Sequence, residues 1–142
     1  MNSKSDNLKI TNLKLAKENL EELLHNFCYI KTNNEIIINF ENYKIIRNQI
    51  DNNYILNYLI YVIENALTNF DRFIVHANIK KLTLLEIDKN KDFICEMASI
   101  LKVKFNNKLE KCIIYEGSYI FKQIYKLLSL FIDKDTLSKI QF

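Results

Sequence analysis

The sequence predicts an α/β domain with a mostly parallel or mixed central sheet sandwiched by helices. Amphipathic stretches, with apolar residues every three or four positions, alternate with short apolar runs rich in β-branched residues. Strands that alternate with helices imply crossover connections within one sheet. The chain of 142 residues has the length of one domain, and no linker or internal repeat divides it. We therefore expect one globular unit at residues 35–142, preceded by an N-terminal segment, residues 1–34, that carries an amphipathic helix.

Four stretches carry apolar residues at the spacing of an amphipathic helix: residues 12–27, 55–67, 88–104 and 118–131. Such a helix turns its polar side to water and needs a larger surface against which to bury its apolar side. A sheet built from the intervening segments can supply that surface. We therefore expect these helices to cover the sheet.

Short apolar runs predict the strands. Residues 35–40 contain three consecutive isoleucines, which suits a buried strand, and residues 70–77 and 111–115 are also largely apolar. We expect a further strand at residues 43–46, and the last residues, 140–142, can begin another. Together with the helical stretches, these runs predict strands and helices in alternation.

The turns are expected at pairs of asparagines. The sequence contains no proline and a single glycine, Gly117. Asparagine tolerates left-handed backbone conformations better than most other non-glycine residues. The pairs at residues 33–34, 52–53 and 106–107 are therefore the predicted turn positions.

Composition and charge exclude several classes of protein. Hydrophobic residues make up 49% of the chain and charged residues 26%, which is typical of a folded domain and unlike a disordered chain. The 20 basic and 17 acidic residues are interspersed, so we expect no nucleic-acid partner. No apolar run approaches the length of about 18 residues that spans a bilayer, and the polar residues 1–6 lack the apolar stretch of a signal peptide. We therefore expect a cytoplasmic protein with at most peripheral membrane contact.

The residues that could support catalysis or bind a metal are sparse, and no cofactor is expected. Cys28, Cys95 and Cys112 are far apart and odd in number, which fits neither a disulfide framework nor a paired zinc motif. We expect them to be small buried side chains. His76 lies in an apolar strand without a nucleophile at a telling spacing, and one glycine cannot form a glycine-rich phosphate loop. The chain is therefore not expected to be an enzyme.

The most specific segment is residues 109–142, which read LEKCIIYEGSYIFKQIYKLLSLFIDKDTLSKIQF. This segment resembles the CRAL-TRIO family, whose signature places an aromatic-Ile-Phe helix before a Pro-Phe-Leu-Asp-x-x-Thr-x-x-Lys-Ile motif. The matching residues are Tyr119, Ile120, Phe121, Phe131, Ile132, Asp133, Thr136, Lys139 and Ile140. Upstream, residues 78–83 resemble the family's Asp-Leu-Lys-Gly-Leu-Ser segment, with Lys81 in place of the glycine. The resemblance implies a divergent, minimal CRAL-TRIO-like fold over residues 35–142.

The resemblance also implies a non-enzymatic binding module. In the family, the helix that matches residues 118–131 is a mobile gate over a lipid pocket, and its apolar face contacts acyl chains. The residues expected to bind the ligand here are Tyr119, Ile120, Phe121, Ile124, Leu127, Leu128, Phe131 and Lys139. The implied partner is a hydrophobic small molecule, such as a phospholipid, between the sheet and this helix. The same apolar face can instead pack on the sheet with no ligand, which leaves a protein-interaction or scaffold domain as the alternative.

Two further expectations follow from departures from the family. Lys139 matches a lysine that contacts the head-group phosphate in phosphoinositide-binding members, but Asn107 replaces their acidic residue. Recognition of phosphoinositides is therefore expected to be weak or absent. The family's preceding subdomain and following segment are reduced or missing here, which would uncover the helix at residues 118–131 or a sheet edge at residues 140–142. We therefore expect a homodimer or another protein partner.

Overall fold

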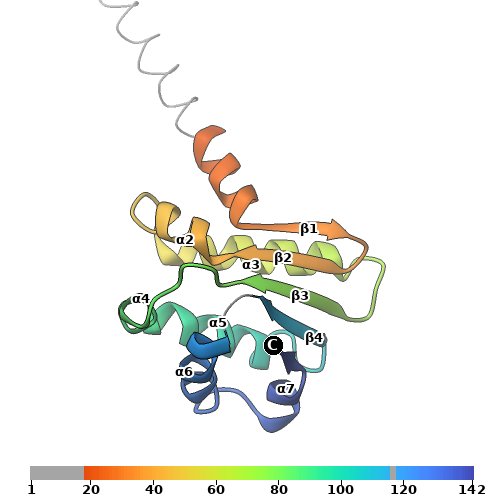
Figure 1. Cartoon of the computed structure of the whole chain (residues 1–142). Helices are drawn as coiled ribbons and strands as arrows, with labels where there is room; N and C mark the ends of the chain where they lie inside the picture. Colours follow the sequence, from red (N-terminus) through yellow and green to blue (C-terminus); the bar gives the residue numbers. More distant parts are fainter. Residues whose placement is uncertain (1–17, 116–117) are drawn as a thin grey trace, which may run out of the picture.

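The computed structural model describes residues 18–115 and 118–142 of the chain (Figure 1). In this part, five strands form one sheet in the order β1-β2-β3-β4-β5. The strands are β1 (Cys28–Thr32), β2 (Glu35–Asn39), β3 (Phe73–Asn78), β4 (Leu109–Tyr115) and β5 (Ile140–Gln141). The helices are α2 (Phe40–Ile46), α3 (Asn52–Ala66), α4 (Leu84–Lys89), α5 (Lys91–Val103), α6 (Ser118–Leu128) and α7 (Lys134–Ser138). Residues 18–27 are also helical and lead directly into β1. The predicted α/β fold class is confirmed.

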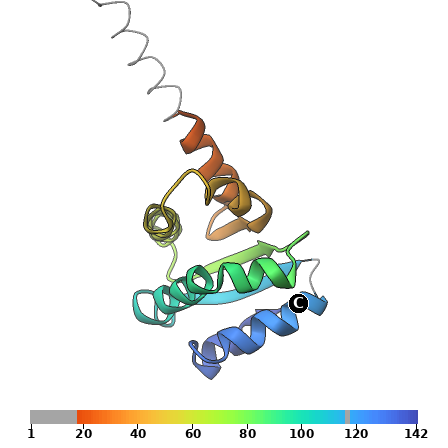
Figure 2. The same cartoon turned by 90° about the vertical axis from the view of Figure 1, so that its left-hand side faces the viewer.

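The sheet is mostly parallel. Strands β1 and β2 form an antiparallel hairpin, whereas β2, β3, β4 and β5 are parallel and lie side by side in sequence order. Connections between parallel strands are nearly always right-handed, so connections that all step in the same direction put their helices on the same face of the sheet. Helices α3, α5 and α6, which link successive parallel strands, pack accordingly over one face (Figure 1 and Figure 2).

The two faces of the sheet carry different sets of residues. The inner face, which the helices cover, consists of Cys28, Ile36, Ile38, Phe73, Val75, Ala77, Leu109, Cys112 and Ile114. All of these residues belong to the main hydrophobic core or pack against it. The outer face, on the opposite side, includes the polar residues Glu35, Asn39, Asn78 and Lys111 as well as Tyr29, Ile37, Ile74, His76, Ile113 and Tyr115. The core therefore lies on one side of the sheet.

The strand predicted at residues 43–46 is wrong, because this segment belongs to helix α2. Tyr43 and Ile46 are both buried, and Ile45 between them is 46% exposed. A spacing of three positions puts the two buried side chains on one face of a helix, but a run of four residues is too short to distinguish this period from that of a strand.

Other elements and boundaries also differ from the sequence-based expectation. The expected turn at residues 52–53 is the first turn of α3, where the side chain of Asp51 accepts a hydrogen bond from the backbone N–H of Asn53 at 2.8 Å. The helix expected at residues 88–104 is two helices, α4 and α5, which meet at Asn90. Strand β1 and the five-residue helix α7 were not predicted, because both are short and mixed in polarity.

Among residues 18–115 and 118–142, three non-glycine residues adopt positive φ angles, and they explain how a chain with one glycine forms its turns. Asn33 (φ 52°) closes the β1–β2 hairpin, and Asn107 (φ 60°) precedes β4, which confirms two of the predicted asparagine turns. Lys81 has φ 64°. It occupies the position at which the related motif has glycine, the residue that adopts this conformation without strain.

Candidate ligand-binding site

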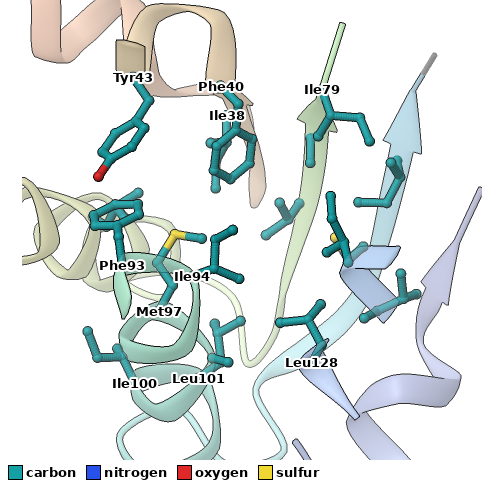
Figure 3. Close-up of a pocket in the computed structure, with 18 of the residues that line it drawn as sticks. Ile38, Phe40, Tyr43, Ile79, Phe93, Ile94, Met97, Ile100, Leu101 and Leu128 are labelled. Carbon is teal, nitrogen blue, oxygen red and sulfur yellow. The ribbon is translucent and has the colours of Figure 1, made fainter. Parts of the chain in front are cut away.

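An apolar cavity lies between the inner face of the sheet and the helices that cover it (Figure 3). Its volume is about 150 Å³. Ile38, Ala77 and Ile114 line it from three neighbouring parallel strands, where alternation along each strand turns these side chains toward the helices. The sheet thus forms one complete wall of the cavity.

Helix α5 supplies a second wall. Phe93, Ile94, Met97, Ile100 and Leu101 line the cavity from this helix (Figure 3). These positions are mostly three or four residues apart, so they share one face of the helix. Cys95, on the same helix, does not line the cavity. Amphipathic spacing in α5 therefore directs a continuous apolar strip at the sheet.

Aromatic side chains close the end of the cavity next to α2. The rings of Tyr43 and Phe93 stack with their centroids 4.3 Å apart, and Phe40 also lines the cavity (Figure 3). The Tyr43 hydroxyl donates a hydrogen bond to Oδ1 of Asn52 at 3.1 Å. Since that hydroxyl already has a partner, Tyr43 presents mainly its apolar ring to the cavity.

The volume of the cavity limits what it can hold in this conformation. Pockets for drug-sized ligands usually measure about 300–1,000 Å³, whereas an apolar cavity of about 150 Å³ accommodates a molecule the size of benzene. The cavity described here is near the lower value. A single aromatic ring or a short alkyl segment fits, but a larger ligand requires the helices to move apart.

Few polar groups reach the lining, and most of them are bonded within the protein. The Thr136 hydroxyl donates to Oδ1 of Asp133 at 2.6 Å, and the Asn90 side-chain amide donates to the backbone oxygen of Glu86 at 2.7 Å. Glu86 itself forms an ion pair with Lys44, with 2.6 Å between Oε1 and Nζ. The lining is therefore suited to apolar surface and has one carboxylate at its margin.

The two cysteines that line the cavity are poor nucleophiles. Burial raises the pKa of the Cys28 thiol to about 12, and it raises the pKa of the Cys112 thiol to about 12 as well. Part of the Cys112 surface faces the cavity, but the surrounding side chains shield its thiol from bulk water. Because only the thiolate reacts readily, both groups act near neutral pH as small apolar side chains. Cys28 is buried as expected, whereas Cys95 and Cys112 are only partly buried.

His76 is hydrogen-bonded on the outer face of the sheet and takes no part in the cavity. Its Nε2 donates to Oε1 of Glu35 at 2.9 Å, and the Tyr115 hydroxyl lies 2.8 Å from Nδ1. The three residues come from neighbouring strands β2, β3 and β4. This chain of hydrogen bonds accounts for a histidine in an otherwise apolar strand.

The structure distributes the residues expected to bind ligand over several environments. Ile124 and Leu128 of α6 line the cavity, and Ile120 and Leu127 pack in the neighbouring core cluster. Phe121 is buried against Phe142, with 4.2 Å between ring centroids, and Phe131 is 43% exposed. The side chain of Tyr119 lies outside the described residues. Lys139 does not line the cavity, and its backbone oxygen accepts a hydrogen bond from Cys112 at 2.9 Å.

Of the expected residues, only Ile124 and Leu128 therefore line the cavity, and most of its lining comes from elsewhere. The lining residues of α5 and of the inner face were noted in the sequence as helix and strand patterns, without a role in ligand binding. Their periodicity shows that they face inward. It does not show that the facing surfaces leave a space between them, because that depends on how the helices seat on the sheet.

The described ranges lack two classes of feature. Residues 18–115 and 118–142 contain no group of three or more His, Cys, Asp or Glu side chains that could hold a metal ion. Within the same ranges, every helix is too short or too polar to cross a membrane.

Comparison with known proteins identifies both the fold and the family. The chain is similar in structure to the crystal structure of Sfh5, with a TM-score of 0.69 and 16% sequence identity. The match covers 82% of this chain and 48% of the Sfh5 chain, so this chain spans about half the length of Sfh5. A search of curated proteins finds no relative. The model of the CRAL/TRIO domain matches residues 14–142. The chain therefore belongs to the CRAL/TRIO domain family.

Proposed function

We propose that this chain is a non-enzymatic binding module that holds a hydrophobic ligand, such as a phospholipid, between the inner face of the sheet and helix α6. The observation that carries this proposal is the apolar cavity, which is lined by the sheet and by helices α3, α5 and α6. Empty apolar space in a protein core lowers stability because the lining atoms lose contacts. Occupation by an apolar molecule would restore those contacts, and membership of the CRAL/TRIO domain family supports the same ligand class.

A phospholipid requires the cavity to enlarge, and α6 is the element best placed to move. It contributes Ile124 and Leu128 to the lining, and it packs against α4 and α5 rather than forming part of the sheet. An outward shift of α6 would open the cavity while the hydrogen bonds between β2, β3 and β4 remain intact. The volume of about 150 Å³ would then describe the closed form.

The proposal that the chain is not an enzyme rests on the chemistry of the lining. The raised pKa values of Cys28 and Cys112 leave both thiols protonated near neutral pH. The imidazole of His76 lies on the opposite face of the sheet, where its two nitrogens contact Glu35 and Tyr115. The cavity thus offers surface for binding and no activated nucleophile among its described residues.

Two tryptophan variants test the cavity. Leu128→Trp fills the cavity from α6, whereas Leu130→Trp places the same side chain at a position that is 76% exposed and does not line it. The chain contains no tryptophan, so each variant also carries a single fluorescent reporter. Native mass spectrometry and extraction into organic solvent should recover a lipid or fatty acid with the wild type and with Leu130→Trp.

Much less lipid should be extracted from the Leu128→Trp protein, because the indole ring occupies the cavity. A wild-type protein that carries no lipid, and that takes up neither phospholipid nor fatty acid from vesicles, would refute the proposal. Phosphoinositide-containing vesicles should give no selective binding that Lys139→Ala abolishes, because Lys139 does not line the cavity and Asn107 replaces the acidic partner.

A protein-interaction module that associates with a second copy is the second candidate, and the outer face of the sheet favours it. Ile37, Ile74 and Ile113 are partly exposed there and lie outside every core cluster of the described residues. A two-fold arrangement is the commonest way for a patch to bury itself against its own copy. Light scattering should then show a dimer for the wild type and a monomer for Ile113→Thr. A monomeric wild type at high concentration would exclude this candidate.

A further inference from the structure

One charged side chain, that of Glu86, contributes to the lining of the apolar cavity. Its Oε1 is paired with Nζ of Lys44, but its Oε2 is buried and has no hydrogen-bond partner among the described residues. A carboxylate oxygen can accept about two hydrogen bonds, and a buried acceptor without a donor is unfavourable. The margin of the cavity therefore holds a strong acceptor whose capacity is not used within the protein.

Hydrogen bonds hold the backbone of Glu86, and the ammonium group of Lys44 holds its carboxylate. The backbone oxygen of Glu86 accepts a hydrogen bond from the side chain of Asn90, and its backbone N–H donates to the Thr83 hydroxyl. Lys44 is held from a second side, because its Nζ also donates to the backbone oxygen of Lys81 at 3.0 Å. An acceptor positioned in this way costs little further ordering when a ligand binds.

We propose that Glu86 orients the ligand by accepting, at Oε2, a hydrogen bond from a hydroxyl group at one end of an otherwise apolar molecule. The inference rests on the proposed function, since it requires that the cavity binds a ligand, and it adds the chemical class of that ligand. The small volume of the cavity restricts it to a slender chain or a single ring when α6 is closed.

A neutral donor fits this position better than a charged group. A ligand carboxylate would bring acceptor oxygens against Oε2 and would be repelled by the charge of Glu86. A ligand ammonium would bring a second cation to a carboxylate that Lys44 already neutralises, and the excess charge would be buried in apolar surroundings. A hydroxyl group donates one hydrogen bond without adding charge.

Glu86 and Lys44 could also serve only to tie α4 to α2, and the experiment separates this structural role from ligand orientation. The probes are benzyl alcohol and anisole, which are isomers, together with ethylbenzene, which carries a methyl group in place of the hydroxyl. Each has one ring and fits a cavity of this volume. Dissociation constants are measured by calorimetry for the wild type and for Glu86→Met, which keeps the length of the side chain and removes the acceptor.

The matched control is Glu41→Met. Glu41 forms a comparable ion pair, with 3.0 Å between Oε1 and Nζ of Lys81, but it does not line the cavity. The affinity for benzyl alcohol relative to anisole should fall by about tenfold or more in Glu86→Met, since a hydrogen bond to a charged group contributes at least that factor. The same ratio should be unchanged in Glu41→Met.

The outcomes separate this inference from the proposed function. If ethylbenzene binds the wild type and the benzyl alcohol to anisole ratio is the same in Glu86→Met, the role of Glu86 is refuted and the binding cavity stands. If none of the three probes binds, both proposals fail. If Glu86→Met does not fold, the test uses the wild type alone. Benzyl alcohol, and not anisole, should then shift the ¹³C resonance of the Glu86 carboxylate in the wild-type protein. An equal response to both isomers would overturn the inference.

Discussion

The two faces of the sheet differ both in their side chains and in their surroundings, and strand β2 shows the difference in surroundings within three residues. Ile36 and Ile38 point to the inner face, and Ile37 between them points to the outer face. Ile36 is completely buried in the main core, whereas Ile37 is partly exposed and belongs to no core cluster of the described residues. The same residue type thus has two environments, because the three crossover helices all lie on one side.

The contrast extends to the polar groups on each face. The outer face holds the hydrogen-bonded row Glu35–His76–Tyr115 across three strands. The inner face lines the cavity. The thiols of Cys28 and Cys112 are the most polar of the lining side chains that the sheet contributes. Groups near solvent can keep charge and hydrogen bonds at small cost, whereas groups under the helices cannot. The difference teaches that one face is suitable for an apolar ligand because the topology of the connections puts the helices over the face whose residues are all apolar.

The largest effect is expected from truncating the isoleucines of β2. Ile36→Ala should lower the free energy of unfolding by about 2–5 kcal/mol, because it removes buried methylene groups and enlarges an existing cavity. Ile37→Ala should lower it by about 1 kcal/mol or less, since part of that side chain already contacts water. Urea unfolding of both variants measures the difference. Equal losses would mean that the outer face is as well covered as the inner face.

For each titrating group, a smaller effect is expected from alkaline pH, and it should arise under the helices. The pKa values of the Cys28 and Cys112 thiols are raised by burial from 9.0 to about 12, and that of Tyr43 is raised from 10.0 to about 12, also mainly by burial. The folded state therefore holds these protons more tightly than the unfolded state. This stability is fully present below pH 9 and is lost as the pH rises toward 12.

Thermal melts between pH 7 and pH 11 measure this loss. The melting temperature should be constant up to about pH 9 and then fall. Above pH 9, each thiol should lower the free energy of unfolding by up to about 1.4 kcal/mol per pH unit. Cys112→Val removes one titrating group without adding charge, so its decline above pH 9 should be shallower. A melting temperature that stays constant up to pH 11 would contradict the burial of these groups.

The smallest effect is expected on the outer face. Tyr115→Phe removes the hydroxyl that lies 2.8 Å from Nδ1 of His76. It should lower the free energy of unfolding by about 0.5–1.5 kcal/mol, the usual net contribution of a hydrogen bond, and should leave the affinity of the cavity for apolar probes unchanged. Chemical unfolding and probe binding test the two parts. A change in probe affinity would show that the two faces are coupled through the sheet.

Much of the fold could be predicted from local patterns in the sequence. Three-residue and four-residue spacing located the helices that became α3, α5 and α6, and apolar runs located β2, β3 and β4. Asn33 and Asn107 have the backbone conformation that their turn propensity predicts. These features depend on the period and the conformational preference of neighbouring residues, so they can be read without knowledge of the tertiary structure.

Only the tertiary structure decided the rest, because it depends on contacts between distant segments. The backbone at residues 43–46 is helical, and in this conformation Tyr43 stacks on Phe93, which lies fifty positions away in the sequence. The carboxylate of Glu86 meets Lys44 through the packing of α4 near α2. The three consecutive isoleucines of β2 are the same residue type. The handedness of the crossover connections determines which of them the helices cover. The cavity exists because those helices, seated on one face, leave a space that no local pattern encodes.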